Sequence, residues 1–146
     1  MSTNSRAVIC ALGLFLFSAC SPTEASESNA QAVVDAIAAK NESILRLTIH
    51  AMPAGETEYV FAASTLASKI GQPSDPEDLQ AIETGEVVVL EETGGIDVTV
   101  PIRLREGKHT AAAGVTMDAS MGQEAAVKAA TAIAAEIDRD WTSAGS

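Results

Sequence analysis

Beyond residue 28, apolar and polar positions follow first a helical and then an alternating pattern. Apolar residues recur every three or four positions after the capping-box pair Ser28 and Gln31, which predicts a helix over about 29–42. From Ile44 to Met52, apolar residues alternate with polar ones, as in a half-buried strand. After a turn sequence, the segment from Thr57 to Ala63 predicts a second strand, antiparallel to the first. One face of the first strand carries Leu45, Leu47, Ile49 and Ala51, and the other carries Arg46, Thr48 and His50.

The rest of the chain predicts a loop with one short helix, then three strands and a final helix. The loop runs from Ser64 to Gly85, and its helix starts with Asp75 as N-cap and Pro76 in the first position. Gly85 ends that helix, and two glycine-containing turns join the strands that follow. The expected strands are 86–92, 96–105 and 109–117, and the expected final helix is 122–141.

This order of elements, α-β-β-α-β-β-β-α, predicts an α+β fold. We expect N- and C-terminal helices to cover one face of a five-stranded antiparallel sheet. Ala111–Gly114 fall in what should be a central strand of that sheet. Such small side chains favour either close packing against the last helix or space for a ligand, and both interpretations stay open.

The first twenty residues have the composition of a secretory signal. Arg6 is the one charged residue before Cys20, and the apolar run Ala7–Phe17 is too short for a lasting transmembrane helix. The string Leu16-Phe17-Ser18-Ala19-Cys20 resembles the lipobox of bacterial lipoproteins, although Phe17 replaces the usual Leu or Val. The resemblance implies that Cys20 is acylated, with palmitate among the expected chains, and becomes the first mature residue.

A lipidated Cys20 divides the chain into a signal peptide (1–19), an acylated cysteine with a flexible tether (20–28) and a single domain (29–146). Cys10 leaves with the signal, so the mature domain has no thiol and must rely on its core instead of a disulfide. Ser21 after the cysteine resembles the outer-membrane sorting pattern. We therefore expect a domain held by a lipid anchor at the outer membrane and facing the periplasm.

The charge of the chain excludes nucleic acid as an expected partner. The net charge of −11 becomes −12 when the segment carrying Arg6 is removed, whereas phosphate binding needs clustered Lys and Arg. Aromatic residues make up 3% of the chain, which also leaves few platforms on which bases could stack.

Several strings in the second half resemble the extracytoplasmic Cache domains, the PAS-like sensor domains of bacterial receptors. In that family a strand ending in Ser or His enters a loop with an Ile-Gly pair, an acidic short helix ends in Thr-Gly, and a hairpin with Gly-Lys closes the sheet. The matching segments here are 59–64, 69–78, 81–85, 100–103 and 107–116. Val60–Ala62 stand where citrate and dicarboxylate sensors carry a basic residue, so the resemblance does not imply carboxylate binding by that route.

The Cache resemblance implies a small-molecule cavity between the sheet and the loop from Ser64 to Gly85. Arg46 and His50 share a strand face that either lines this cavity or faces water. Arg103 either borders the cavity or is an exposed hairpin residue. The predicted ligand-binding residues are Arg46, His50, Tyr59, Ser64, Lys69 and Arg103.

Sequence motifs for catalysis, metal binding or a cofactor are missing. His50 and His109 are the only histidines, and we expect His109 to be an exposed neighbour of a turn. Glu91-Glu92 and Ser74–Asp78 offer carboxylates for a hard cation, but helix capping already explains the second group. We therefore predict no catalytic residue, no metal site and no cofactor.

Two functions follow as hypotheses. The first is a membrane-anchored sensor-like module that binds a small polar metabolite or ion. No transmembrane relay or kinase follows within the 146 residues, so such a module is expected to act through an envelope or receptor protein. The alternative is a structural or interaction lipoprotein of the cell envelope without a small-molecule ligand.

Overall fold

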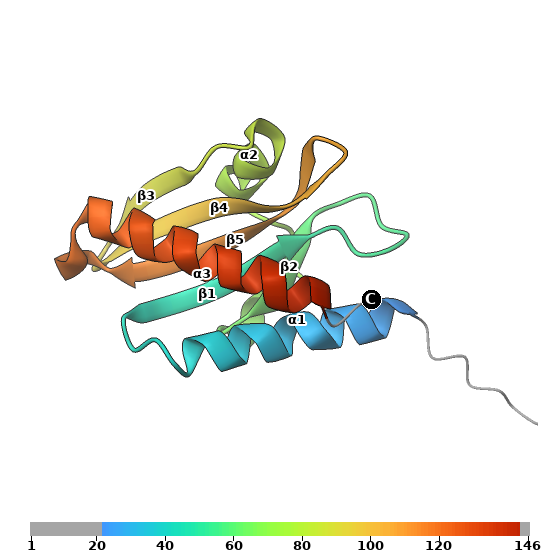
Figure 1. Ribbon diagram of the computed structural model, residues 1–146, viewed down its shortest axis with the longest axis horizontal. Coiled ribbons are helices and arrows are strands. Elements are labelled where there is room, and N and C mark those ends of the chain that lie inside the picture. Colours follow the sequence, from blue (N-terminus) through green and yellow to red (C-terminus); the bar gives the residue numbers. More distant parts are fainter. Residues whose placement is uncertain (1–21, 144–146) are drawn as a thin grey trace, which may run out of the picture.

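The computed structural model describes residues 22–143 and contains three α-helices around one sheet within that range (Figure 1). The sheet has the strand order β2-β1-β5-β4-β3, and every neighbouring pair is antiparallel. The predicted fold class and order of elements are confirmed. The helices are α1 (Pro22–Ala38), α2 (Pro76–Thr84) and α3 (Gln123–Ser143), and the strands are β1 (Ile44–Ala51), β2 (Val60–Ser64), β3 (Val88–Glu92), β4 (Gly95–Arg105) and β5 (Lys108–Asp118).

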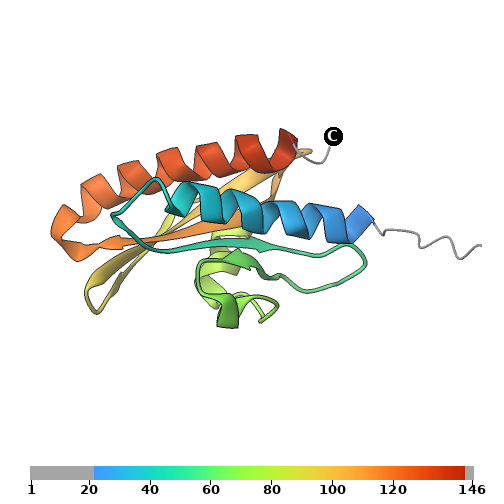
Figure 2. The ribbon, with the colours of Figure 1, turned by 90° about the horizontal axis from the view of Figure 1, so that it is seen from below.

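The two faces of the sheet are covered by different elements. Helices α1 and α3 lie side by side on one face, as predicted, while α2 and the loop before it lie on the other (Figure 2). The apolar side chains of the central strands, among them Leu47, Ile49 and Val115, are fully buried beneath α1 and α3. Among residues 22–143, no helix combines the length and the apolar character needed to cross a membrane.

Helix α1 differs from its predicted bounds at both ends. It begins at Pro22, so residues 22–28, predicted to be a flexible tether, are helical; a proline is well tolerated at the first helical position. Gln31 does not cap this helix, because its carboxamide accepts a bond from Ser64 N and donates one to Ser64 O, both 3.0 Å long. The helix ends at Ala38, and Asn41 donates to the carbonyl of Ile37 beyond that end.

The small residues of β5 allow close packing on both faces of the sheet. Ala111 and Ala113 are fully buried in the core under α1 and α3, which confirms the close-packing interpretation for that face. Gly114 points to the opposite face, where a Cβ atom would lie 2.4 Å from Thr48 Oγ1 and 3.3 Å from His50 Nε2. Gly114 therefore leaves the room that two polar side chains of β1 occupy.

Helix α2 has the predicted start and stop. Asp75 is its N-cap, Pro76 its first residue, and Gly85 ends it in the left-handed conformation with φ of 72°. Asp78 returns a bond to the start of the helix, since its Oδ2 accepts from Asp75 N at 3.0 Å. His109 is partly buried against the end of α2, where its ring contacts Gly85, instead of being exposed as expected.

Candidate ligand-binding pocket

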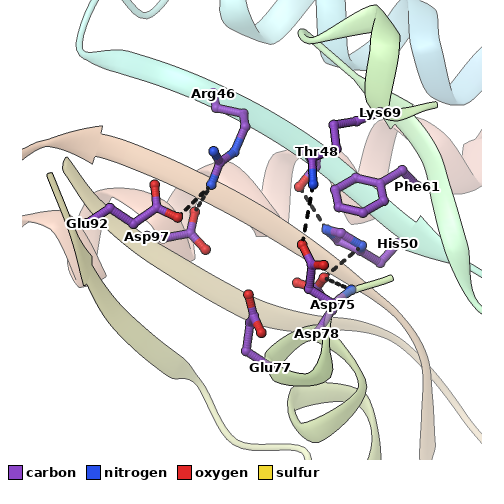
Figure 3. Close-up of a pocket in the computed structure, with 10 residues that line it drawn as sticks. All are labelled: Arg46, Thr48, His50, Phe61, Lys69, Asp75, Glu77, Asp78, Glu92 and Asp97. Atoms are coloured by element: carbon purple, nitrogen blue, oxygen red, sulfur yellow. Dashed lines mark hydrogen bonds and ion pairs between the residues drawn. The ribbon is translucent and has the colours of Figure 1, made fainter. Parts of the chain in front are cut away.

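A polar pocket of about 110 Å³ lies between the sheet and α2, on the face opposite α1 and α3 (Figure 3). We call it the central pocket. Strands β1, β3 and β4 supply its sheet side, and β2, the loop after β2 and the start of α2 supply the rest. Its lining residues are Arg46, Thr48, His50, Phe61, Lys69, Asp75, Glu77, Asp78, Glu92 and Asp97.

The floor of the central pocket is a buried chain of hydrogen bonds that starts on β1 and ends on α2. Thr48 Oγ1 donates to Gly114 O over 3.2 Å and lies 2.9 Å from His50 Nε2. On the other side of the ring, His50 Nδ1 lies 3.1 Å from both Asp78 Oδ2 and Ser74 Oγ. Because the proton of Thr48 is used by Gly114, His50 carries its own proton on Nε2, and Nδ1 is left to accept.

Asp78 connects α2 to the sheet through both of its carboxyl oxygens. Oδ1 accepts from Thr99 Oγ1 of β4 at 3.3 Å, and Oδ2 faces His50. Burial raises the pKa of Asp78 to about 7; the bond from Asp75 N partly offsets this, and the charge of Glu77 adds to the rise. Asp78 therefore keeps a proton at pH values where an exposed aspartate has lost it.

The pKa of His50 is shifted in the opposite direction to that of Asp78. Burial, followed by the positive charges of Arg46 and Lys69, lowers its pKa to about 3. Together the two shifts place the shared proton on Asp78, so that Asp78 donates to His50 Nδ1 and the pair is neutral between about pH 3 and 7. An ion pair at this depth would need two buried charges, and the neutral form avoids that cost.

Arg46 holds the opposite wall of the central pocket. Its Nη2 atom donates to Glu92 Oε1 at 3.1 Å and to Asp97 Oδ1 at 3.4 Å. Asp97 is only 7% exposed, and the same Oδ1 also accepts from Thr116 Oγ1 at 2.5 Å. One guanidinium group thus links β1, β3 and β4 at the edge of the pocket.

Lys69 closes the pocket from the loop after β2. Its Nζ atom lies 3.7 Å from Asp75 Oδ2 and 4.9 Å from the centre of the Phe61 ring. The Phe61 ring in turn meets His50 edge to face, with ring centres 4.4 Å apart. The aromatic ring separates the buried histidine from the lysine ammonium group.

Three of the six predicted ligand-binding residues come together here. Arg46, His50 and Lys69 line the central pocket, which decides between the cavity and the solvent interpretations of the polar face of β1. Tyr59 and Ser64 are not among the lining residues; the backbone of Ser64 is bound by the side chain of Gln31, as described above.

Arg103 lies on the opposite face of the sheet from the central pocket. Its backbone has φ of 56°, which interrupts the alternation of β4. Its guanidinium carbon lies 3.5 Å from the centre of the Trp141 ring on α3, and Nη2 donates to Trp141 O at 3.3 Å. Arg103 therefore belongs to the contact between the sheet and α3, and neither sequence interpretation placed it there.

Seven lining residues are not among the six predicted ligand-binding residues: Thr48, Phe61, Asp75, Glu77, Asp78, Glu92 and Asp97. Asp97 could have been predicted from the sequence, because Asp97 and Thr99 alternate with apolar residues along β4 and indicate a polar face on a buried strand. Glu77 belongs to the Ser74–Asp78 group that helix capping explains, but its place in the first turn of α2 does not describe where its side chain lies.

The carboxylates do not form a metal site in the part of the chain that the structure describes. Across these residues, no three His, Cys, Asp or Glu side chains are grouped so that they could hold a metal ion. Glu91 is exposed, whereas its neighbour Glu92 turns to Arg46. The hypothesis of a hard cation bound by these groups thus has no geometric support.

Thr48, His50 and Asp78 are connected in the order of a nucleophile, a base and an orienting acid. The distances of 2.9 Å and 3.1 Å suit such a triad. However, Thr48 is 3% exposed, and its Oγ1 atom donates to Gly114 O and packs directly over Gly114. The hydroxyl group thus acts as a structural link between β1 and β5.

The described fold resembles that of GAF domains. The GAF domain from Acinetobacter phosphoenolpyruvate-protein phosphotransferase has a TM-score of 0.58 at 16% sequence identity, covering 82% of this chain and 84% of that one. The GAF domain/HD domain protein from Geobacter sulfurreducens has a TM-score of 0.57 at 9% identity, covering 84% and 95%. A type II free methionine-R-sulfoxide reductase from Thermoplasma acidophilum has a TM-score of 0.50 at 15% identity, covering 82% and 96%.

No protein-family model matches the sequence, and no curated protein matches it. The lipobox and its Cys20 lie outside the described residues, and the Cache resemblance stays a prediction. At identities of 9% to 16%, the structural similarities establish the fold alone. The chain therefore has a PAS-like α+β fold of the kind seen in GAF domains.

Proposed function

We propose that this protein is a membrane-anchored extracytoplasmic module that binds a small polar molecule and passes its occupancy to a partner protein. The observation that carries the proposal is the central pocket itself. It is polar and lies apart from the apolar core, on the face of the sheet opposite α1 and α3. Burying His50, Asp78 and Asp97 costs stability, and convergent polar groups in a pocket are typical of binding sites.

The anchor in this proposal is the lipobox cysteine, Cys20. Helix α1 begins at Pro22, so Ser21 alone lies between Cys20 and the helix, and the two residue steps from Cys20 to Pro22 span about 7 Å at most. The domain would then lie against the membrane instead of moving freely on a long tether. A partner that responds to its occupancy must accordingly be found at or near the same membrane surface.

Thermal melting of the purified protein against a library of small polar metabolites tests the binding function. A ligand present at 100 times its Kd raises the free energy of unfolding by about 2.7 kcal/mol, which is a readily measured shift. Lys69→Met changes the charge of the pocket lining and should alter the shift, whereas Lys40→Met, in the exposed turn after α1, should leave it unchanged. If no compound shifts the melting temperature, and cross-linking in cells captures an envelope protein, the structural lipoprotein is the better description.

Labelling with radioactive palmitate tests the anchor separately. The wild-type protein and a Cys10→Ser variant should both incorporate label, because Cys10 leaves with the signal peptide. Cys20→Ser should incorporate none. Label that persists in Cys20→Ser would refute lipidation at this residue and, with it, the proposed attachment to the membrane.

A further inference from the structure

The charges that line the central pocket are unequal in number. Besides Asp78, the lining carries four acidic side chains, Asp75, Glu77, Glu92 and Asp97, and only two basic ones, Arg46 and Lys69. His50 and Asp78 add no charge while they share their proton. The space between the sheet and α2 is therefore negative.

Both cations are already engaged by carboxylates of the pocket. Arg46 binds Glu92 and Asp97 through Nη2, and the charge of Lys69 lies between Asp75 and the Phe61 ring. An incoming anion would have to compete with these carboxylates and would meet the excess negative charge at the same time. The pairing thus disfavours an anionic ligand.

Two acceptors in the pocket have no partner among the described residues. Asp97 is 7% exposed, and both of its side-chain bonds use Oδ1, so Oδ2 of this lining residue makes no bond within the described part of the chain. Glu77 makes no hydrogen bond or ion pair in the described part of the chain and points into the same space (Figure 3). A ligand that donates hydrogen bonds would therefore find carboxylate oxygens in the pocket that no donor of the described residues occupies.

We propose that the central pocket binds a small ligand bearing an ammonium group, and that binding expels the proton shared by His50 and Asp78. The inference rests on the proposed function, since it assumes that the pocket takes a small molecule. The ammonium group would donate to Asp97 Oδ2 and Glu77. The pocket volume of about 110 Å³ equals the share of roughly four liquid waters, so the ligand is small.

The proton is released because a second positive charge enters the same small space. Before binding, the neutral pair is favoured by burial and by nearby negative charge. An ammonium group beside Asp78 favours its carboxylate form, so the proton leaves to the buffer and the net charge of the pocket stays unchanged. The remaining ring proton moves to Nδ1, where it binds Asp78, and Thr48 then donates to Nε2. The charged groups that face this pair are Arg46 from β1, Lys69 and Asp75 from the loop after β2, Glu77 from α2, Glu92 from β3 and Asp97 from β4.

Titration calorimetry with three matched probes tests the proposal. Ethanolamine, glycolate and ethylene glycol are similar in size and differ in charge. We expect ethanolamine to bind, with a heat that varies with the ionisation enthalpy of the buffer and reports the release of up to one proton at pH 6. Its affinity should rise as much as tenfold per pH unit below pH 7 and level off above it, because only the ionised form of Asp78 then remains.

Two variants test whether Glu77 binds the ammonium group and whether Asp78 releases the proton. Glu77→Gln should weaken ethanolamine binding at least several-fold, while Glu83→Gln, exposed on the same helix, should leave it unchanged. Asp78→Asn should abolish proton release. If Asp78→Asn does not fold, the dependence of the wild-type heat on the buffer still decides the question.

The outcomes separate this inference from the proposed function. Tighter binding of glycolate or ethylene glycol than of ethanolamine overturns the ammonium proposal and leaves a small-molecule site in place. Ethanolamine binding without proton release overturns the exchange. If neither these probes nor any compound of the metabolite library binds, both the inference and the proposed function are wrong.

Discussion

His50 Nδ1 and Asp78 Oδ2 lie 3.1 Å apart in a contact where both residues are almost fully buried, 2% and 4% exposed. In the folded protein the pKa of Asp78 is raised to about 7 and that of His50 is lowered to about 3, so the pair holds one proton between these values. In the unfolded chain the pair also holds one proton between about pH 4 and 6.5, but it is on His50. Folding therefore moves this proton from one residue to the other without changing the number bound.

We predict that this pair contributes no pH dependence to the free energy of unfolding between about pH 4 and 6.5. Substituting either residue alone should make the free energy of unfolding depend on pH, with opposite signs for the two residues. In Asp78→Asn, the lowered pKa of His50 remains; its stabilising contribution is present above pH 6.5 and is lost as the pH falls towards 3. In His50→Gln, the raised pKa of Asp78 remains; its contribution is present below about pH 4 and is lost as the pH rises through 7. Each slope, relative to wild type, should approach about 1.4 kcal/mol per pH unit.

Urea unfolding at pH 4.5, 5.5 and 6.5 measures these slopes. Relative to wild type, the free energy of unfolding of Asp78→Asn should rise with pH and that of His50→Gln should fall. Glu83→Gln, exposed on α2, serves as the control for the loss of a carboxylate and should follow wild type. Parallel profiles for Asp78→Asn and His50→Gln would show that the two residues do not share a proton.

Gly114 lies directly against Thr48 under the central pocket, and we predict that Gly114→Ala is strongly destabilising. The added methyl group would lie 2.4 Å from Thr48 Oγ1 and 3.3 Å from His50 Nε2, so the strands must move or the hydrogen-bond chain must break. Overpacking of this kind typically costs about 1–3 kcal/mol. Thermal or urea unfolding of the variant measures the loss.

A double substitution identifies the cause of that loss. Thr48→Ala alone loses the bonds to Gly114 O and His50, but in the Gly114→Ala background it also removes the atom that the new methyl group would strike. The double variant should therefore lose less stability than the sum of the two single variants. Additive losses would mean that Gly114 matters for a reason other than room for Thr48.

The sequence predicted the elements of the sheet better than it predicted what covers its second face. Alternation along β1 placed Arg46, Thr48 and His50 on one face because strand side chains alternate strictly. It could not show that this face is buried, since the elements that cover it, α2 and the loop before it, are distant in sequence and their position depends on tertiary packing. Asp78 is an example: its role in capping α2 could be predicted from the local sequence, whereas its contact with His50 could not.

The errors at α1 and Arg103 have physical causes of the same kind. Ser28 and Gln31 have the spacing of a capping box, but Gln31 binds the edge strand β2 instead, and the helix continues to Pro22. Strand alternation would place Arg103 on the pocket face, but its left-handed backbone directs the side chain to α3. Local patterns identify elements reliably when no distant partner competes for the same groups.

Gln31 joins α1 to β2 through two bonds with the backbone of Ser64, and we predict that Gln31→Ala destabilises the protein by about 1–3 kcal/mol. Ser64 is 2% exposed, so its N–H and C=O groups would lose their partner while still shielded from water. Asp35→Ala is the matched control, because it removes only the exposed bond between Gln31 and Asp35 on the same helix. Hydrogen exchange at the Ser64 amide should speed up in Gln31→Ala alone; unchanged exchange there would count against the bond.

Arg103 combines a left-handed backbone with a side chain stacked on Trp141, and the two features predict an unusual order of stability. Arg103→Ala loses the stacking and keeps the strained φ of 56°, whereas Arg103→Gly loses the same stacking but accepts that φ without strain. The glycine variant should therefore be the more stable of the two, by about 1 kcal/mol. In most strand positions glycine is less stabilising than alanine. Arg105 does not have a left-handed backbone, so Arg105→Ala should be more stable than Arg105→Gly.

Trp141 provides the readout for this last comparison because it is the only tryptophan of the chain and is 5% exposed. Both Arg103 variants remove the group that covers one face of its ring, so its fluorescence maximum should shift to longer wavelength in the folded state. Arg105→Ala should leave the spectrum unchanged, since Arg105 is exposed in the β4–β5 hairpin. A more stable alanine than glycine variant at position 103, with the same spectral shift, would mean that the stacking holds and that the backbone there is not left-handed in solution.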